Sequence, residues 1–150
     1  MVKATSEVRV NSSFYRPPTP GTTASWAKKT PGDFVFSVKL WQKFTHPKMY
    51  EVATGAAAAI SLADVDTFKR SLGPLASAGK LGALLAQFPP SFKNNAYSRQ
   101  VLGGVARHFG EYGLAVELRD KSWSDDPGTE FPQLYNYELM VTPKAFMISL

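Results

Sequence analysis

The stretch GLAVELRDKSW, residues 113–123, decides the fold prediction because it joins an apolar strand pattern to charged residues at the strand's end. Its apolar residues alternate: Leu114, Val116 and Leu118. Successive side chains of a strand point to opposite faces, so these three residues share one face. Glu117 and Arg119 share the other face, which places an acid and a base together where the strand ends.

The residues before this strand predict an alternation of strands and helices. Strands are predicted for residues 6–13, 33–41 and 80–90, and helices for residues 22–29, 63–80 and 95–110. The strand at 80–90 is a continuous apolar run, which is typical of a strand buried on both faces. This order of elements indicates repeated βαβ units and a parallel sheet, so the predicted fold class is α/β.

Two other stretches carry weaker patterns. Residues 42–62 are expected to be irregular, and Gly73 with Pro74 argues against the last turn of the helix that follows. The tail, residues 124–150, shows no helical pattern, and only KAFMISL at 144–150 allows a strand.

The helix at 95–110 has an expected buried face and an expected end. Tyr97, Val101 and Val105 are spaced to share one side of it. Gly110 is where a left-handed C-terminal cap is expected.

Composition places the chain among globular domains. It has 150 residues, of which 44% are hydrophobic and 19% charged, so one domain is expected. No apolar run approaches the roughly 18 to 20 residues that a membrane helix needs. Glu7 and Arg9 interrupt the region where a signal peptide would be apolar. We therefore expect a cytoplasmic protein with no membrane partner.

Metal and cofactor chemistry is not indicated by the residue types. The chain has no cysteine and only two histidines, His46 and His108, which excludes a thiolate zinc site and a histidine-rich metal site. We therefore predict no metal and no cofactor.

The net charge of +5 is compatible with an anionic partner. Lysines and arginines are scattered, with no run of four. A solvated basic surface explains this distribution more commonly than nucleic-acid binding does.

Four strings of the chain resemble one known family. They are VNSSFYR at 10–16, PGDFVFSVKL at 31–40, KLGALLAQFPPSF at 80–92 and AVELRDKSW at 115–123. In this order they resemble the YecE-like family, domain of unknown function 72. The FTHP string around His46 also resembles that family.

The resemblance implies a TIM-type (β/α) barrel in which the four strings end strands two to five. A full barrel usually takes about 250 residues, so about half of a barrel is expected here. Residues 1–123 are then a fragment of a YecE-like domain, and 124–150 are an atypical tail.

The chain departs from the family pattern in three places. The first family strand, with its Gly-Thr-Ser-Gly-like string, is missing, and Arg9 stands where the family has a glutamate. No counterpart of the Arg-Leu-His-Gly-like stretch follows Trp123. These departures predict a truncated product, whose exposed sheet edges would favour self-association.

Polar residues at the predicted strand ends form the candidate site. They are Asn11, Lys39, Gln87, Glu117 and Arg119. TIM barrels carry their functional residues at the C-terminal ends of the strands. We therefore expect these side chains to converge in the barrel mouth and to bind an anionic or polyhydroxylated small molecule.

Three residues are candidates for catalysis. Glu117 suits proton transfer, although an internal ion pair with Lys39 or Arg119 would explain it equally well. Lys39 suits phosphate or carboxylate binding, or nucleophilic attack if it is buried. His46 would reach the mouth from a loop as an acid–base group, although loop histidines commonly have no such role.

The other candidates are expected to bind ligand, and they are Asn11, Tyr15, Arg16, Gln87, Arg119 and Trp123. The two amides would orient the ligand, since neither titrates. The aromatic side chains would form a stacking wall, or alternatively would close the core.

Three functions follow from these patterns. The first is a small-molecule enzyme of unassigned reaction, in which the strand-end residues act. The second is a non-catalytic nucleic-acid-binding protein, whose affinity would fall steeply as salt rises. The third is a truncated product without function. Fold class does not decide between them.

Overall fold

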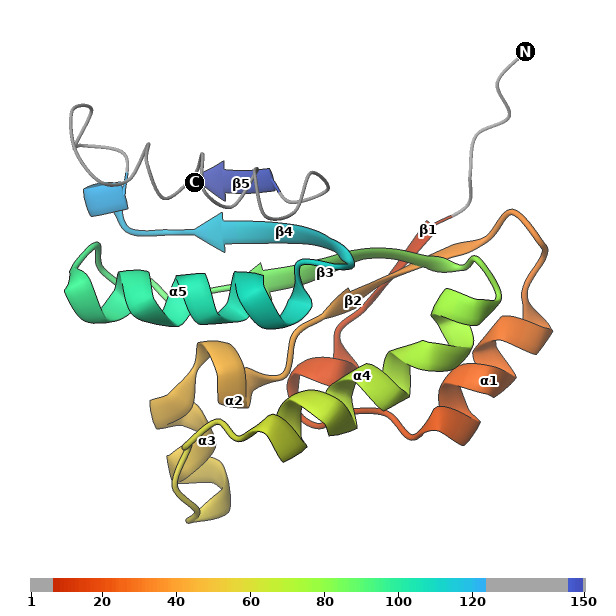
Figure 1. Ribbon diagram of the computed structural model, residues 1–150, viewed down its shortest axis with the longest axis horizontal. Helices are drawn as coiled ribbons and strands as arrows, with labels where there is room; N and C mark the ends of the chain where they lie inside the picture. Colours follow the sequence, from red (N-terminus) through yellow and green to blue (C-terminus); the bar gives the residue numbers. More distant parts are fainter. Residues whose placement is uncertain (1–6, 124–145, 150) are drawn as a thin grey trace. The chain divides into compact units, whose positions relative to one another are not determined.

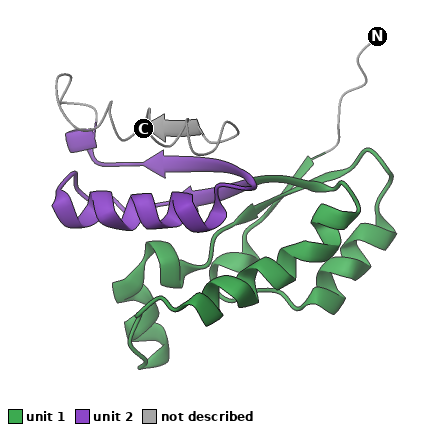
Figure 2. Ribbon diagram, viewed as in Figure 1, with its two compact units in different colours: residues 1–83 green, residues 84–150 purple. Residues whose placement is uncertain are grey.

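The computed structural model describes residues 7–123 and 146–149, and the chain divides into two compact units, residues 1–83 and 84–150 (Figures 1 and 2). The strand β3, Leu81–Gln87, runs from the first unit into the second.

Parallel strands form the sheet of the first unit. β1, Glu7–Val10, pairs in parallel with β2, Val35–Lys39, so that Val8 lies opposite Phe36. The backbone N–H of Phe36 donates to the carbonyl of Lys80 at 2.7 Å, next to the first residue of β3. The one-turn 3₁₀ helix η1, Ser12–Phe14, follows β1 directly.

Two longer helices pack against each other in this unit. α1, Pro20–Lys29, begins at the capping residue Thr19, and Trp26 of α1 stacks on Phe36 with ring centroids 5.7 Å apart. α4, Leu62–Ser77, packs on α1. The predicted helices at 22–29 and 63–80 are thus confirmed, with shifted ends.

The expectation that Gly73 and Pro74 would end α4 early was wrong. The helix continues to Ser77, and Gly79 then takes a left-handed conformation with φ +68°. Leu72 and Leu75, one on each side of the Gly-Pro pair, are fully buried. This packing holds the last turn despite the backbone hydrogen bond that proline removes.

The prediction of an irregular stretch at 42–62 was also wrong for its first part. Two short helices occupy it: α2, Gln42–Thr45, and α3, Pro47–Thr54. α3 has only eight residues, which is shorter than the window of roughly 11–18 residues in which a helical period is recognised.

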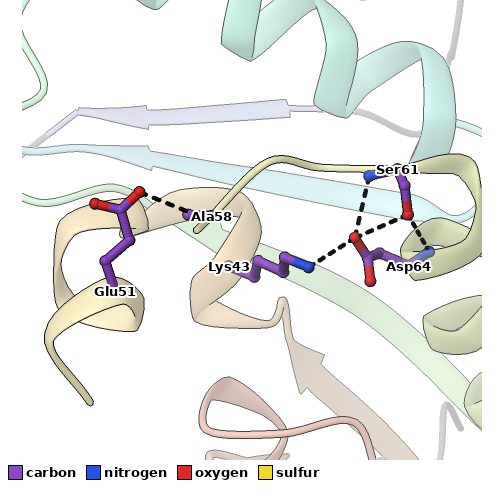
Figure 3. Close-up of polar contacts among 5 residues, drawn as sticks. All are labelled: Lys43, Glu51, Ala58, Ser61 and Asp64. Carbon is purple, nitrogen blue, oxygen red and sulfur yellow. Dashed lines mark hydrogen bonds and ion pairs between the residues drawn. The ribbon is translucent and has the colours of Figure 1, made fainter. Parts of the chain in front are cut away.

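Polar contacts tie this region to the start of α4 (Figure 3). Lys43 Nζ lies 2.8 Å from Asp64 Oδ2, and Asp64 also closes a capping box with Ser61. The backbone N–H of Ala58 donates to Glu51 Oε1 at 3.2 Å, which fixes the loop after α3.

The second unit contains the end of β3 and three further elements. These are α5, Ala96–Phe109, β4, Gly113–Leu118, and β5, Phe146–Ser149. The backbone N–H of Phe88 donates to the carbonyl of Glu117 at 3.1 Å, and β4 pairs in parallel with β5. The strand order is therefore β1-β2-β3-β4-β5, and the predicted α/β class is confirmed.

The strand expected within 144–150 is confirmed as β5, whereas the rest of the predicted tail, 124–145, lies outside the described residues. No helix of the described part of the chain has the length and apolarity to cross a membrane.

The expected face of α5 was confirmed at Val105, which is buried, and wrong at Tyr97, which is 69% exposed. The buried apolar side chains are Leu102, Val105, Ala106 and Phe109. Tyr97 lies in the first turn of α5, before the buried part of the helix begins. The expected left-handed cap was wrong too, because Gly110 has φ −69°.

Candidate functional site

A buried carboxylate lies at the C-terminal end of β4. Glu117 is 8% exposed, and its Oε1 accepts a hydrogen bond from Gln87 Nε2 at 2.8 Å. Gln87 is the last residue of β3, so the ends of two neighbouring parallel strands supply this contact. The expectation that strand-end residues would meet is confirmed for these two.

Arg119 completes this cluster, which we call the Glu117 cluster (Gln87, Glu117 and Arg119). Its Nε donates to Glu117 Oε1 at 2.9 Å, and its side chain is 41% exposed. The ion pair considered from the sequence is therefore present. It joins a buried carboxylate to a cation at the surface of the unit.

Trp123 is placed away from solvent. It is fully buried, its ring stacks on Phe92 with centroids 5.4 Å apart, and its Nε1 donates to the carbonyl of Phe92 at 2.7 Å. Phe92 stacks in turn on Phe88. This environment supports the alternative in which Trp123 closes the core rather than contacting a ligand.

The first unit holds a second group of candidates around Phe14. The Lys39 ammonium lies 4.7 Å from the centre of the Phe14 ring, and the His46 ring meets the same ring edge-on, with centroids 4.9 Å apart. Phe14 itself is 7% exposed. Lys39 and His46 are thus placed by one shared aromatic ring.

Three further candidates lie just after β1. Asn11 caps η1 without a side-chain hydrogen bond to the helix, and Tyr15 and Arg16 are exposed. The convergence of both groups of candidates on one ligand stays a prediction.

Several contributors to these clusters gave little signal in the sequence. Ser13 is buried, and its hydroxyl donates to the carbonyl of Lys39 at 2.7 Å, which ties η1 to the end of β2. Thr45 is 2% exposed and lies 2.8 Å from His46 Nδ1. Serine and threonine carry no distinctive pattern, so only the VNSSFYR and FTHP strings pointed to these positions.

The described residues hold no group of three or more His, Cys, Asp or Glu side chains arranged for a metal ion. In Asp64, burial raises the pKa, but hydrogen bonds from Lys43 and Ser61 more than offset it and leave the pKa below 3.8.

Comparison with known sequences places the chain in a family. The family described as "Protein of unknown function DUF72" matches residues 3–143. The UPF0759 protein YunF of Bacillus subtilis strain 168 is 31% identical over 120 residues, which cover 80% of this chain and 41% of YunF.

Solved structures show the same fold. One is a DUF72 family protein of Enterococcus faecalis V583, with a TM-score of 0.73 at 24% identity. The match covers 94% of this chain and 48% of the Enterococcus protein. Another is a DUF72 family protein of Thermotoga maritima MSB8, with a TM-score of 0.63 at 29% identity. That match covers 88% of this chain and 46% of the Thermotoga protein. The chain spans less than half the length of these relatives. The partial barrel is consistent with these likenesses, and the family match confirms the resemblance: the chain belongs to the DUF72 family.

Proposed function

We propose that this chain contributes part of a binding site for an anionic or polyhydroxylated small molecule, centred on the Glu117 cluster. One observation carries the proposal: Glu117, buried at the end of a parallel strand, accepts hydrogen bonds from Gln87 and Arg119 at 2.8 and 2.9 Å. Proteins of the barrel class place their ligand sites at this end of the strands.

Arg119 would supply the anion-binding group. Its Nε is engaged by Glu117, which orients the guanidinium plane, and its side chain remains 41% exposed. Within the described residues, its two terminal nitrogens donate no hydrogen bond. A guanidinium binds carboxylate or phosphate through two parallel hydrogen bonds. The ligand's anionic group would therefore lie against the terminal nitrogens.

Glu117 would accept hydrogen bonds from ligand hydroxyls or transfer a proton. Two donors on Oε1 hold the carboxylate in one orientation, and a base acts efficiently only when it is held in reach of its proton. In an enzyme, Glu117 would be the proton-transfer residue, with Lys39 and His46 as further candidates. In a binding protein, the same carboxylate would select hydroxylated ligands.

The proposal is tested by calorimetric titration of the full chain with inorganic phosphate, glucose and glucose 6-phosphate. We expect glucose 6-phosphate to bind more tightly than either of the other two. Replacing Arg119 by Gln should weaken binding of the phosphorylated probe at least about tenfold, since a hydrogen bond to a charged group contributes roughly 1.5–3 kcal/mol. Arg107→Gln is the matched control, because Arg107 is exposed on α5 of the same unit.

Two results would overturn the proposal. One is that none of the three probes binds the wild-type chain. The other is that Arg119→Gln binds glucose 6-phosphate as tightly as the wild type does. Binding of duplex DNA that weakens steeply with salt, in either of these cases, would favour a nucleic-acid partner.

A further inference from the structure

The His46 ring has a buried hydrogen-bond partner next to it in the sequence. Thr45 Oγ1 lies 2.8 Å from His46 Nδ1. Thr45 is 2% exposed, at the end of α2, and His46 then forms the junction between α2 and α3 with φ −132° and ψ 63°. The edge-on contact with Phe14 restricts the ring plane further.

The hydroxyl proton of Thr45 decides the direction of this hydrogen bond. A neutral imidazole carries a proton on one nitrogen only, so Nδ1 either donates to the hydroxyl or accepts from it. If Nδ1 donated, the Thr45 hydroxyl proton would need another acceptor. Within the described residues, the bond to His46 is the only hydrogen bond that this hydroxyl makes.

The energetic difference between the two directions is substantial. A buried donor left without an acceptor is costly, and Thr45 is too deeply buried for water to supply an acceptor. When the Thr45 hydroxyl donates to Nδ1, both groups are satisfied. This direction leaves the imidazole proton on Nε2.

We infer that Thr45 is a positioning residue that holds neutral His46 with its proton on Nε2. His46 then carries its N–H donor on Nε2, so a group that this nitrogen meets must be an acceptor. The inference goes beyond the proposed function, because it concerns the first unit alone. The tautomer itself does not depend on any ligand.

The tautomer is measured by long-range proton–nitrogen NMR spectra of the ¹⁵N-labelled full chain, at a pH where the rings are neutral. The chain has only two histidines, so His108 is an internal control in the same spectrum. We expect a single Nε2-protonated pattern for His46. In Thr45→Val, which removes the hydroxyl but keeps the shape, the His46 nitrogens should shift toward a tautomer mixture, while those of His108 should not.

Thr45→Ser is the rescue variant, and it should restore the wild-type His46 pattern. Unchanged backbone amide spectra elsewhere would show that each variant folds. An Nδ1-protonated His46 in the wild type would overturn the inference, and so would identical His46 patterns in the wild type and in Thr45→Val.

The ligand titrations separate this inference from the proposed function. If the NMR pattern is as expected and no probe binds, the tautomer assignment stands and the proposed function fails. If glucose 6-phosphate binds through Arg119 and His46 is Nδ1-protonated, the proposed function stands and the inference fails.

Discussion

Lys80 donates a hydrogen bond of 2.7 Å from its ammonium group to the carbonyl oxygen of Thr30, just past the C-terminal end of α1. The same nitrogen donates to the carbonyl of Ala27 at 2.6 Å and to the Thr30 hydroxyl at 3.1 Å. Lys80 is 7% exposed, so its charge is buried against the negative end of the helix dipole. One side chain at the start of β3 therefore caps a helix that lies far from it in the sequence.

Replacing Lys80 by Met should lower the free energy of unfolding by about 1–3 kcal/mol, because the carbonyls of Ala27 and Thr30 lose a charged donor. Lys29→Met is the control, since Lys29 lies in the last turn of α1 but is exposed. Urea denaturation measures both variants. Equal midpoints for the two would show that Lys80 contributes no more than a surface lysine.

The distance of Lys80 from its partners explains why the sequence did not indicate this cap. The contacts span 53 and 50 residues, and a lysine that precedes a strand has no distinctive spacing. The strands themselves were predictable, because β2 and β4 alternate apolar residues and β3 is an apolar run. A regular period of apolar residues can be recognised within one short stretch of sequence. A helix cap supplied by a residue far away in the sequence cannot.

In the candidate site, too, contacts between strand ends could be predicted from the sequence, whereas contacts that depend on burial could not. Gln87 and Glu117 could be predicted to meet because each ends a strand and consecutive strands are neighbours in a parallel sheet. Thr45 could not be predicted, because its role depends on the burial of a hydroxyl that any threonine carries. The helix α3 was missed because its eight residues are too few to show a helical period, and its contact through Tyr50 with Trp41 is not visible in the sequence.

Two glycines should respond in opposite ways to alanine. A Cβ at Gly82 would lie 3.0 Å from Ser37 Oγ and 3.2 Å from the carbonyl oxygen of Phe36. The backbone of β2 cannot retreat easily, so Gly82→Ala should destabilise the chain by about 1–3 kcal/mol. A Cβ at Gly104 of α5 would meet only the end of the Arg107 side chain, at 3.9 Å, and Gly104→Ala should stabilise α5 by about 0.5–1 kcal/mol. Chemical denaturation of both variants decides this, and a stable Gly82→Ala would contradict the tight strand contact.

Trp123 should contribute through both its ring and its N–H. Trp123→Phe keeps an aromatic ring against Phe92 and loses the 2.7 Å hydrogen bond, so a loss of about 1 kcal/mol is expected. Trp123→Ala also leaves a cavity, and a loss of about 3–5 kcal/mol is expected. The losses of unfolding free energy in the two variants should therefore differ severalfold. If Trp123→Ala were nearly as stable as the wild type, Trp123 would not be part of the core.

Asp64 should make stability depend on pH in the acidic range. Burial raises its pKa, but the hydrogen bonds from Lys43 and Ser61 bring the pKa below the ordinary 3.8. A carboxyl whose pKa is lower in the folded than in the unfolded state stabilises the fold above the unfolded pKa, and this contribution is lost as pH falls through the folded pKa. Asp64→Asn should therefore cost about 1 kcal/mol at neutral pH, where the pair with Lys43 is intact, and progressively less as the pH falls below about 4. Denaturation between pH 3 and pH 7 measures this, with Asp66→Asn, exposed on the same helix, as the control. A difference from the wild type that stayed constant through this pH range would show that the charge of Asp64 contributes nothing to stability.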